Sequence, residues 1–277
     1  MMAPSRCRIR YYDWSVQIVA IVALGRSVEE EAPRLAEDLG LTTYETAVML
    51  RAPMPVIVLR SEDRARALRV LDKLRSRGHD AVTCELDAVV SSDDMFRPRA
   101  FRFDAGDFVG IGHGEERRLP LADVFALIRA NHVTRTEDTV VDRQRRISLG
   151  RGALTGGLLM TKTTTTESRR VTSERESVLY VFRSDAPPWL LASTELRYDG
   201  LAEGMRISRM QNFEVLIDTL RARTPSAAFD ARLLAVRAST TVVAASPTHL
   251  ATSSSGALDV LAHVVAIALG RATQPYR

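Results

Sequence analysis

The clearest folding signal in the chain lies in residues 55–85, which read PVIVLRSEDRARALRVLDKLRSRGHDAVTCE. The apolar run at 54–59 predicts a buried strand, and Ser61 is a favourable N-cap for a helix after it. Four apolar residues recur in that helix at spacings of three and four and form one stripe: Ala67, Val70, Leu71 and Leu74. Gly78 ends the helix, and residues 81–86 predict a returning strand. The stretch therefore predicts a strand, an amphipathic helix and a second strand.

The residues before this stretch predict the rest of a small module. Residues 16–24 form a Val/Ile-rich run, which is typical of a buried strand. Arginines before the run also fit a signal peptide, but Asp13 and Gln17 interrupt that pattern. Ser27 and Thr42 each precede a glutamate by three residues, so each opens a helix with a capping box. The resulting order of strand, two helices, strand, helix and strand predicts a sheet with helices packed on one face.

The quoted stretch resembles small bacterial signal-transducing modules of ferredoxin-like type. The resemblance covers about thirty residues and contains no catalytic motif. It implies a regulatory or binding role, and it transfers no functional residue to this chain. We therefore expect residues 1–95 to form a ferredoxin-like α/β module, followed by a polar linker.

The next region, residues 96–238, predicts a strand-rich module. A hairpin is expected around Ala105 and Gly106, strands at 177–183 and 189–198, and a closing amphipathic helix that starts at Ser208. The segments FRFDAGDFVGIG, LPLADVFALI, ESVLYVFRSD and NFEVLIDTL resemble bacterial PH-like or GRAM-type domains. This resemblance implies lipid or protein binding and no chemistry. The predicted fold class is therefore α+β, with a ferredoxin-like module before a PH-like one.

The C-terminal part of the chain has two different compositions. Residues 239–256 are rich in Ser, Thr and Ala, which predicts a flexible linker. Residues 257–277 predict an apolar C-terminal helix that is too short to span a bilayer. Because it is apolar nearly all round, this helix must be buried, and we expect it to dock on its own chain. Asp259 and His263 lie at i and i+4 on it, and we interpret them as a polar stripe rather than a catalytic pair.

Composition narrows the range of functions. The chain has 277 residues, 45% of them hydrophobic and 26% charged, and a formal charge of +4. Its two cysteines, Cys7 and Cys84, form neither a disulfide framework nor a zinc site, which predicts free thiols in the cytoplasm. The glycines at 110–114 lack the spacing of a dinucleotide loop and predict a hairpin turn. We expect no cofactor and no metal ion.

One segment concentrates positive charge inside a long polar stretch, residues 132–175. Between 142 and 175 it has eight basic and three acidic residues and no aromatic residue. This stretch is either a solvated loop or a dock for an acidic protein, phospholipid head groups or duplex phosphate. The lack of aromatic stacking platforms argues against nucleic acid. The candidate partner-binding residues are Arg143, Arg145, Arg146, Arg151, Lys162, Arg169 and Arg170.

These observations predict a non-catalytic regulatory or scaffold protein that binds another protein. The first alternative is a peripheral binder of anionic lipid that uses the basic stretch and the last helix. The second alternative is an enzyme with carboxylate chemistry, because sequence alone cannot pair carboxylates across a cleft.

Overall fold

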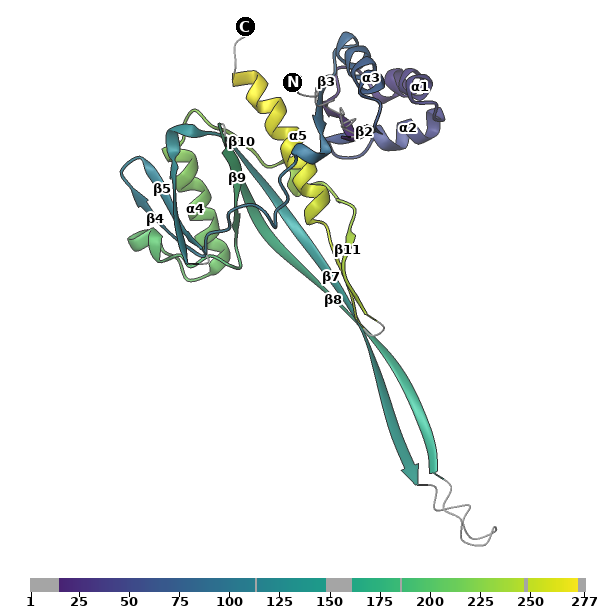
Figure 1. The fold of residues 1–277 in the computed structure, drawn as a ribbon, viewed down its shortest axis with the longest axis vertical. Coiled ribbons are helices and arrows are strands. Elements are labelled where there is room, and N and C mark those ends of the chain that lie inside the picture. The colour runs from purple at the N-terminus through teal and green to yellow at the C-terminus, as the bar shows by residue number, and fades with distance from the viewer. Residues whose placement is uncertain (1–14, 113, 148–160, 185, 247–248, 274–277) are drawn as a thin grey trace, which may run out of the picture.

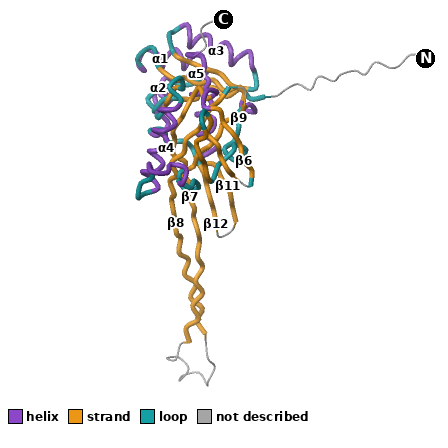
Figure 2. The backbone as a smooth tube through the Cα atoms, turned by 90° about the vertical axis from the view of Figure 1, so that its left-hand side faces the viewer, coloured by secondary structure: helices purple, strands orange, loops and turns teal. Residues whose placement is uncertain are grey.

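The computed structural model shows a mixed α+β protein with an elongated shape (Figure 1). It describes residues 15–112, 114–147, 161–184, 186–246 and 249–273. Two folded parts lie on either side of a C-terminal helix, and a two-stranded ribbon extends far from both (Figures 1 and 2). Within the described residues, no helix is both long and apolar enough to cross a membrane. Cys7 and Asp13 lie outside the described residues, and Cys84 is a half-buried free thiol.

The N-terminal part contains the predicted elements in the predicted order. They are β1 (Gln17–Ala23), α1 (Val28–Leu39), α2 (Thr43–Leu50), β2 (Val56–Ser61), α3 (Arg64–Ser76) and β3 (Asp80–Glu85). The strand order is β2-β1-β3, and β1 is antiparallel to both neighbours. The predicted stripe of α3 is buried against Val19, Ile21 and Leu35, so α1 and α3 cover one face of this sheet.

The helix starts in this part follow local hydrogen bonding. Thr42 makes a complete capping box with Glu45, as predicted, and the Ser27 hydroxyl accepts the N–H of Glu30 at 3.3 Å. The predicted N-cap at Ser61 is wrong. Ser61 still belongs to β2, and Asp63 caps α3 by accepting the N–H of Arg66 at 2.9 Å. The helix therefore begins later than the sequence pattern predicts.

The second part contains two sheets and one long helix. Its first sheet has the order β4-β5-β6, and its second has the path β11-β12-β7-β8-β9, with β10 beside β7. Their bounds are β4 (Ala100–Asp104), β5 (Asp107–Gly112), β6 (Glu115–Pro120), β7 (Val124–Ile147), β8 (Thr161–Arg183), β9 (Ala186–Ala192), β10 (Ala228–Asp230), β11 (Thr241–Ser246), β12 (His249–Ser253) and α4 (Arg209–Arg223). Short 3₁₀ turns are η1 (Leu86–Ala88), η2 (Leu121–Asp123), η3 (Asp199–Gly204) and η4 (Arg232–Leu234).

An aromatic core holds these sheets and α4 together. Phe108, Trp189 and Phe213 are almost fully buried in one cluster between the three-stranded sheet, the larger sheet and α4. Gly110 lies in β5, where a Cβ atom would come within 2.8 Å of the Trp189 ring. Close packing, rather than phosphate binding, therefore explains this glycine. The hairpin predicted around Ala105 and Gly106 is confirmed, since β4 and β5 pair on either side of these residues. The strand predicted at 189–198 ends at Ala192.

The polar stretch 132–175 is not a loop where the structure describes it. Its described residues continue β7 and β8, which pair without a break from Ala126↔Phe182 to Ile147↔Thr161. The solvated-loop interpretation of residues 142–175 is therefore wrong for 142–147 and 161–175. The backbone pairing of β7 with β8 runs through all of these residues.

The predicted flexible linker is also structured. Within 239–256, β11 and β12 form a hairpin, and β12 pairs with Thr134–Asp138 of β7. The last helix, α5 (Ser255–Thr273), docks on its own chain as predicted. Leu258 and Val265 pack on the larger sheet, and Val264 packs on the face of the N-terminal sheet that α1 and α3 leave open. Most apolar side chains of this helix are therefore covered by its own chain.

Candidate functional site

The most prominent feature of the molecule is the part of the β7–β8 ribbon that lies beyond β12. The pairing of β12 with β7 ends at Asp138, and β9 pairs with β8 only from Val178 onward. Past these points, no other described strand pairs with the ribbon. We call residues 139–147 and 161–170 the outer ribbon. Its nine residue pairs beyond Asp138 extend about 30 Å at 3.3 Å per residue, and Figure 2 shows them clear of the two folded parts.

The outer ribbon concentrates the charge of the chain. It has six basic residues and two acidic ones, a net charge of +4 that equals the formal charge of the whole protein. The formal charges of all the other residues therefore sum to zero. The six basic residues are Arg143, Arg145, Arg146, Lys162, Arg169 and Arg170.

The pairing register distributes these positions over both faces of the ribbon. Cross-strand partners share a face, and successive residues alternate. Three positions fall on one face: Arg143, Arg145 and Arg169. Arg146, which is directly opposite Lys162, and Arg170 fall on the other. Of the predicted residues, the structure thus brings six onto one element, whereas Arg151 lies outside the described residues.

A buried polar network fixes the base of the ribbon. The Tyr180 hydroxyl of β8 donates to Asp259 Oδ1 of α5 at 2.7 Å, and His132 Nε2 of β7 lies 2.7 Å from the same hydroxyl. Because the Tyr180 proton points to Asp259, the Tyr180 oxygen accepts the Nε2 hydrogen of His132. The other Asp259 oxygen accepts the N–H of Ser92 at 2.8 Å. One carboxylate therefore joins both ribbon strands, α5 and the segment between the two folded parts.

The protonation states in this network follow from burial. Loss of water lowers the pKa of His132 to about 4, helped by the positive charge of Arg97. Burial also raises the pKa of Asp259 and raises that of Tyr180 well above its ordinary value. All three side chains are at most 6% exposed. Substrate cannot reach so enclosed a histidine, tyrosine and aspartate, so their role is to position the ribbon.

His263 is engaged in the same structural way. Its Nδ1 bonds to the Asp259 carbonyl oxygen at 2.8 Å, and its Nε2 accepts the N–H of Val90 at 3.2 Å. Burial lowers its pKa, which agrees with a neutral ring. The side chains of Asp259 and His263 therefore each accept a backbone N–H from the segment between β3 and β4, and they do not pair with each other.

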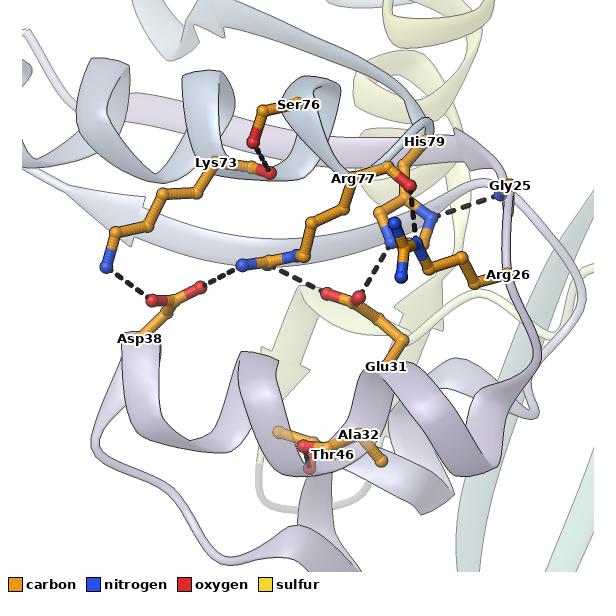
Figure 3. Close-up of polar contacts among 10 residues, drawn as sticks. All are labelled: Gly25, Arg26, Glu31, Ala32, Asp38, Thr46, Lys73, Ser76, Arg77 and His79. Atoms are coloured by element: carbon orange, nitrogen blue, oxygen red, sulfur yellow. Dashed lines mark hydrogen bonds and ion pairs between the residues drawn. The ribbon is translucent and has the colours of Figure 1, made fainter.

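A second buried network lies in the N-terminal part (Figure 3). Glu31 of α1 contacts His79 Nε2 at 2.9 Å and Arg77 at 2.8 Å, and Arg77 also contacts Asp38 at 2.8 Å. Lys73 completes the chain at 2.6 Å from Asp38. Partial burial acts to raise the pKa of Asp38, but its hydrogen bonds from Lys73 and Arg77 hold it below the ordinary value. These contacts clamp α1 to the end of α3.

The histidine in this network has a defined tautomer. The N–H of Gly25 donates to His79 Nδ1 at 3.1 Å, so that nitrogen carries no hydrogen. The other ring nitrogen, Nε2, is the one that lies 2.9 Å from a Glu31 carboxylate oxygen. Both side chains are fully enclosed. This cluster has catalytic residue types, but it is a structural tie.

One groove opens on the surface beside α5. Its volume is about 950 Å³, and its lining includes Phe125, Phe182, Pro187, His263, Arg183 and Asp123. Asp123 is the single carboxylate that lines it, and Asp259 faces the interior network instead. Convergent carboxylates, which the enzyme alternative requires, are therefore absent from this groove. The described residues also contain no group of side chains arranged to hold a metal ion.

Sequence reasoning missed both buried networks, because their members come from distant parts of the chain. It also missed a group of exposed apolar side chains at 205–210, just before and within the first turn of α4. The sequence did hold a signal there. Ile207 precedes the N-cap Ser208, but the fourth helical residue, on which such an apolar residue usually packs, is the polar Asn212. Comparison with known proteins finds no matching family model, no matching curated protein and no matching solved structure.

Proposed function

We propose that this chain is a non-catalytic regulatory or scaffold protein that binds an acidic protein through its outer ribbon. The observation that carries the proposal is the outer ribbon itself, which pairs with no other described strand and has a net charge of +4. An isolated two-stranded ribbon is at best marginally stable in water. An element of this length therefore gains stability when a partner covers it.

The chemistry of the ribbon edges favours a polypeptide partner. Each outer strand has one edge whose backbone N–H and C=O groups meet no other described strand. A polypeptide strand offers both donors and acceptors at the required spacing, whereas phosphate groups, including those of lipids, offer acceptors only. The described outer ribbon has no aromatic residue for base stacking, which argues against single-stranded nucleic acid. An acidic strand would satisfy both the edge and the charge.

The two folded parts are suited to holding the outer ribbon. The order β2-β1-β3, with α3 linking the two outer strands, is consistent with the split β-α-β unit of a ferredoxin-like module. Two sheets packed with α4 are consistent with a PH-like module. Asp259 and Tyr180 tie the ribbon base to α5, which packs on both parts.

The test uses the register of the ribbon. Asp138 and Arg170 are directly opposite each other, so an Asn-Gly turn can replace residues 139–169 and close a short hairpin. A second variant, R143E/R145E/R146E, keeps the ribbon and reverses its charge. The matched control R34E/R60E/R237E makes the same charge change at exposed positions elsewhere. Binding is measured by fluorescence anisotropy with a labelled peptide of alternating Glu and Val.

The full chain and the control are expected to bind this peptide with an affinity that falls as salt rises. The shortened ribbon and R143E/R145E/R146E are expected to lose binding while keeping their unfolding midpoints. A peptide of alternating Glu and Pro has the same charge but cannot extend a ladder, so it should bind more weakly. Undiminished binding by the shortened ribbon, or equal binding of the Glu-Pro peptide, would overturn the proposal.

A further inference from the structure

A cluster of exposed apolar side chains lies where α4 begins. Ile207 is 105% exposed, Met210 is 74% exposed and Met205 is 52% exposed. Single exposed apolar residues are common, but three within six residues form a protruding apolar tip. We call residues 205–210 the α4 loop. Figure 1 shows that α4 begins on the side of its module from which the ribbon extends.

The α4 loop is held in place by hydrogen bonds between side chains and its backbone. Ser208 caps α4 by accepting the N–H of Gln211 at 3.2 Å. The buried side chain of Asn212 accepts the N–H of Arg206 and donates to its carbonyl oxygen, the latter at 3.1 Å. These bonds fix the chain on both sides of Ile207. The tip is therefore a built surface feature rather than a frayed end.

The exposure of Ile207 also follows from Asn212. An apolar residue before an N-cap usually packs on the fourth helical residue in a hydrophobic staple. That fourth residue is Asn212, whose side chain is occupied by the backbone of Arg206. Ile207 thus lacks the partner that would draw it onto α4. Its side chain points away from the helix instead.

Positive charges flank the apolar tip. Arg206 and Arg209 alternate with Met205, Ile207 and Met210, and both arginines are exposed. Arg209 is anchored through a hydrogen bond to the carbonyl oxygen of Thr194 at 2.7 Å. Residues 204–213 contain no acidic residue. Apolar side chains between cations match an anionic bilayer interface, where apolar groups enter the head-group region and arginines meet lipid phosphates.

We propose that the α4 loop docks the protein on an anionic lipid surface, with Ile207 and Met210 inserted and Arg206 and Arg209 on the head groups. The loop is convex, and three side chains expose much less than the ~800 Å² that each partner buries in a standard protein interface. A bilayer accepts a protrusion of any shape, so a small convex tip suits it better than a protein partner. This role is independent of the outer ribbon and would place the ribbon at a membrane.

The experiment measures co-sedimentation of the full chain with two kinds of vesicle, phosphatidylcholine alone and phosphatidylcholine mixed with phosphatidylglycerol. The test variants are I207S/M210S and R206Q/R209Q. Their matched controls are V242S/V243S, at exposed valines of β11, and R34Q/R60Q, at exposed arginines of the N-terminal part. Thermal melts confirm that each variant remains folded.

The full chain and both controls are expected to bind the mixed vesicles and not phosphatidylcholine alone. R206Q/R209Q should lower partitioning about 30-fold, because two cations near an anionic surface contribute about 2 kcal/mol and 1.36 kcal/mol is tenfold. I207S/M210S should lower it at least ~tenfold. The shortened-ribbon variant should still bind. Vesicle binding that survives both loop variants, or that disappears when the ribbon alone is shortened, would refute this role.

Discussion

The pH dependence of stability can be predicted at His132. The ring is 6% exposed, and burial lowers its pKa from 6.5 to about 4. The unfolded chain therefore binds a proton near pH 6.5, whereas the folded chain binds it only near pH 4. Between these values the unfolded state holds more protons, so stability is full above pH 6.5 and falls as pH falls.

The full pKa difference corresponds to about 3 kcal/mol, and the part between about pH 7.5 and pH 5 is about 2 kcal/mol. Urea unfolding at these two pH values measures it. H132Q keeps an N–H for the Tyr180 oxygen but cannot be protonated, so its stability should fall by about 2 kcal/mol less than that of the parent. Y180F should retain the parental pH dependence, because burial rather than the hydrogen bond lowers this pKa. An H132Q protein with the parental dependence would refute the reasoning.

Three further predictions concern packing and the second network. Val264→Ala should lower the free energy of unfolding by about 2 kcal/mol in urea, because Val264 is fully buried between α5 and the N-terminal sheet, whereas exposed Val242→Ala should change it by less than ~0.5 kcal/mol. Glu31→Ala should cost about 3 kcal/mol, since it takes a buried carboxylate partner away from Arg77 and His79, and exposed Glu30→Ala serves as its control; equal losses would contradict the clamp. Gly25→Ala should lower the melting temperature, because its Cβ would lie 2.0 Å from a backbone carbonyl oxygen, and an unchanged melting curve would argue against that close approach.

Much of the N-terminal part could be predicted because burial leaves a pattern in its sequence: α3 has one buried face, and β1 is buried on both. Ala67, Val70, Leu71 and Leu74 form a stripe only because α3 packs on a sheet, and the stripe locates the helix. The α4 face was predictable for the same reason. The start of α3 was not, since Ser61 and Asp63 are both good caps and strand pairing with β1 decides between them.

The polar ties could not be predicted from spacing. Glu31 and His79, or Tyr180 and Asp259, meet only after the sheets and α5 have assembled, and no local pattern links them. Asp259 and His263 did have a local pattern, but their side chains do not pair with each other. Asp259 accepts from the Tyr180 hydroxyl and from a backbone N–H of the segment between β3 and β4, and His263 accepts from another backbone N–H of that segment. Sequence spacing limits which side chains can meet, and burial decides which do.

The outer ribbon escaped prediction for a reason that bears on its function. Alternation of apolar and polar residues arises when one face of a strand is buried, and it identifies strands only in that case. Residues 139–147 and 161–170 have polar and charged residues at positions on both faces, so their sequence is indistinguishable from that of a solvated loop. A strand that no other part of its own chain covers must have such a sequence if it is to remain free in water. The polar pattern that hides the outer ribbon from periodicity is thus one that the proposed partner binding requires of a ribbon whose edges pair with no other described strand.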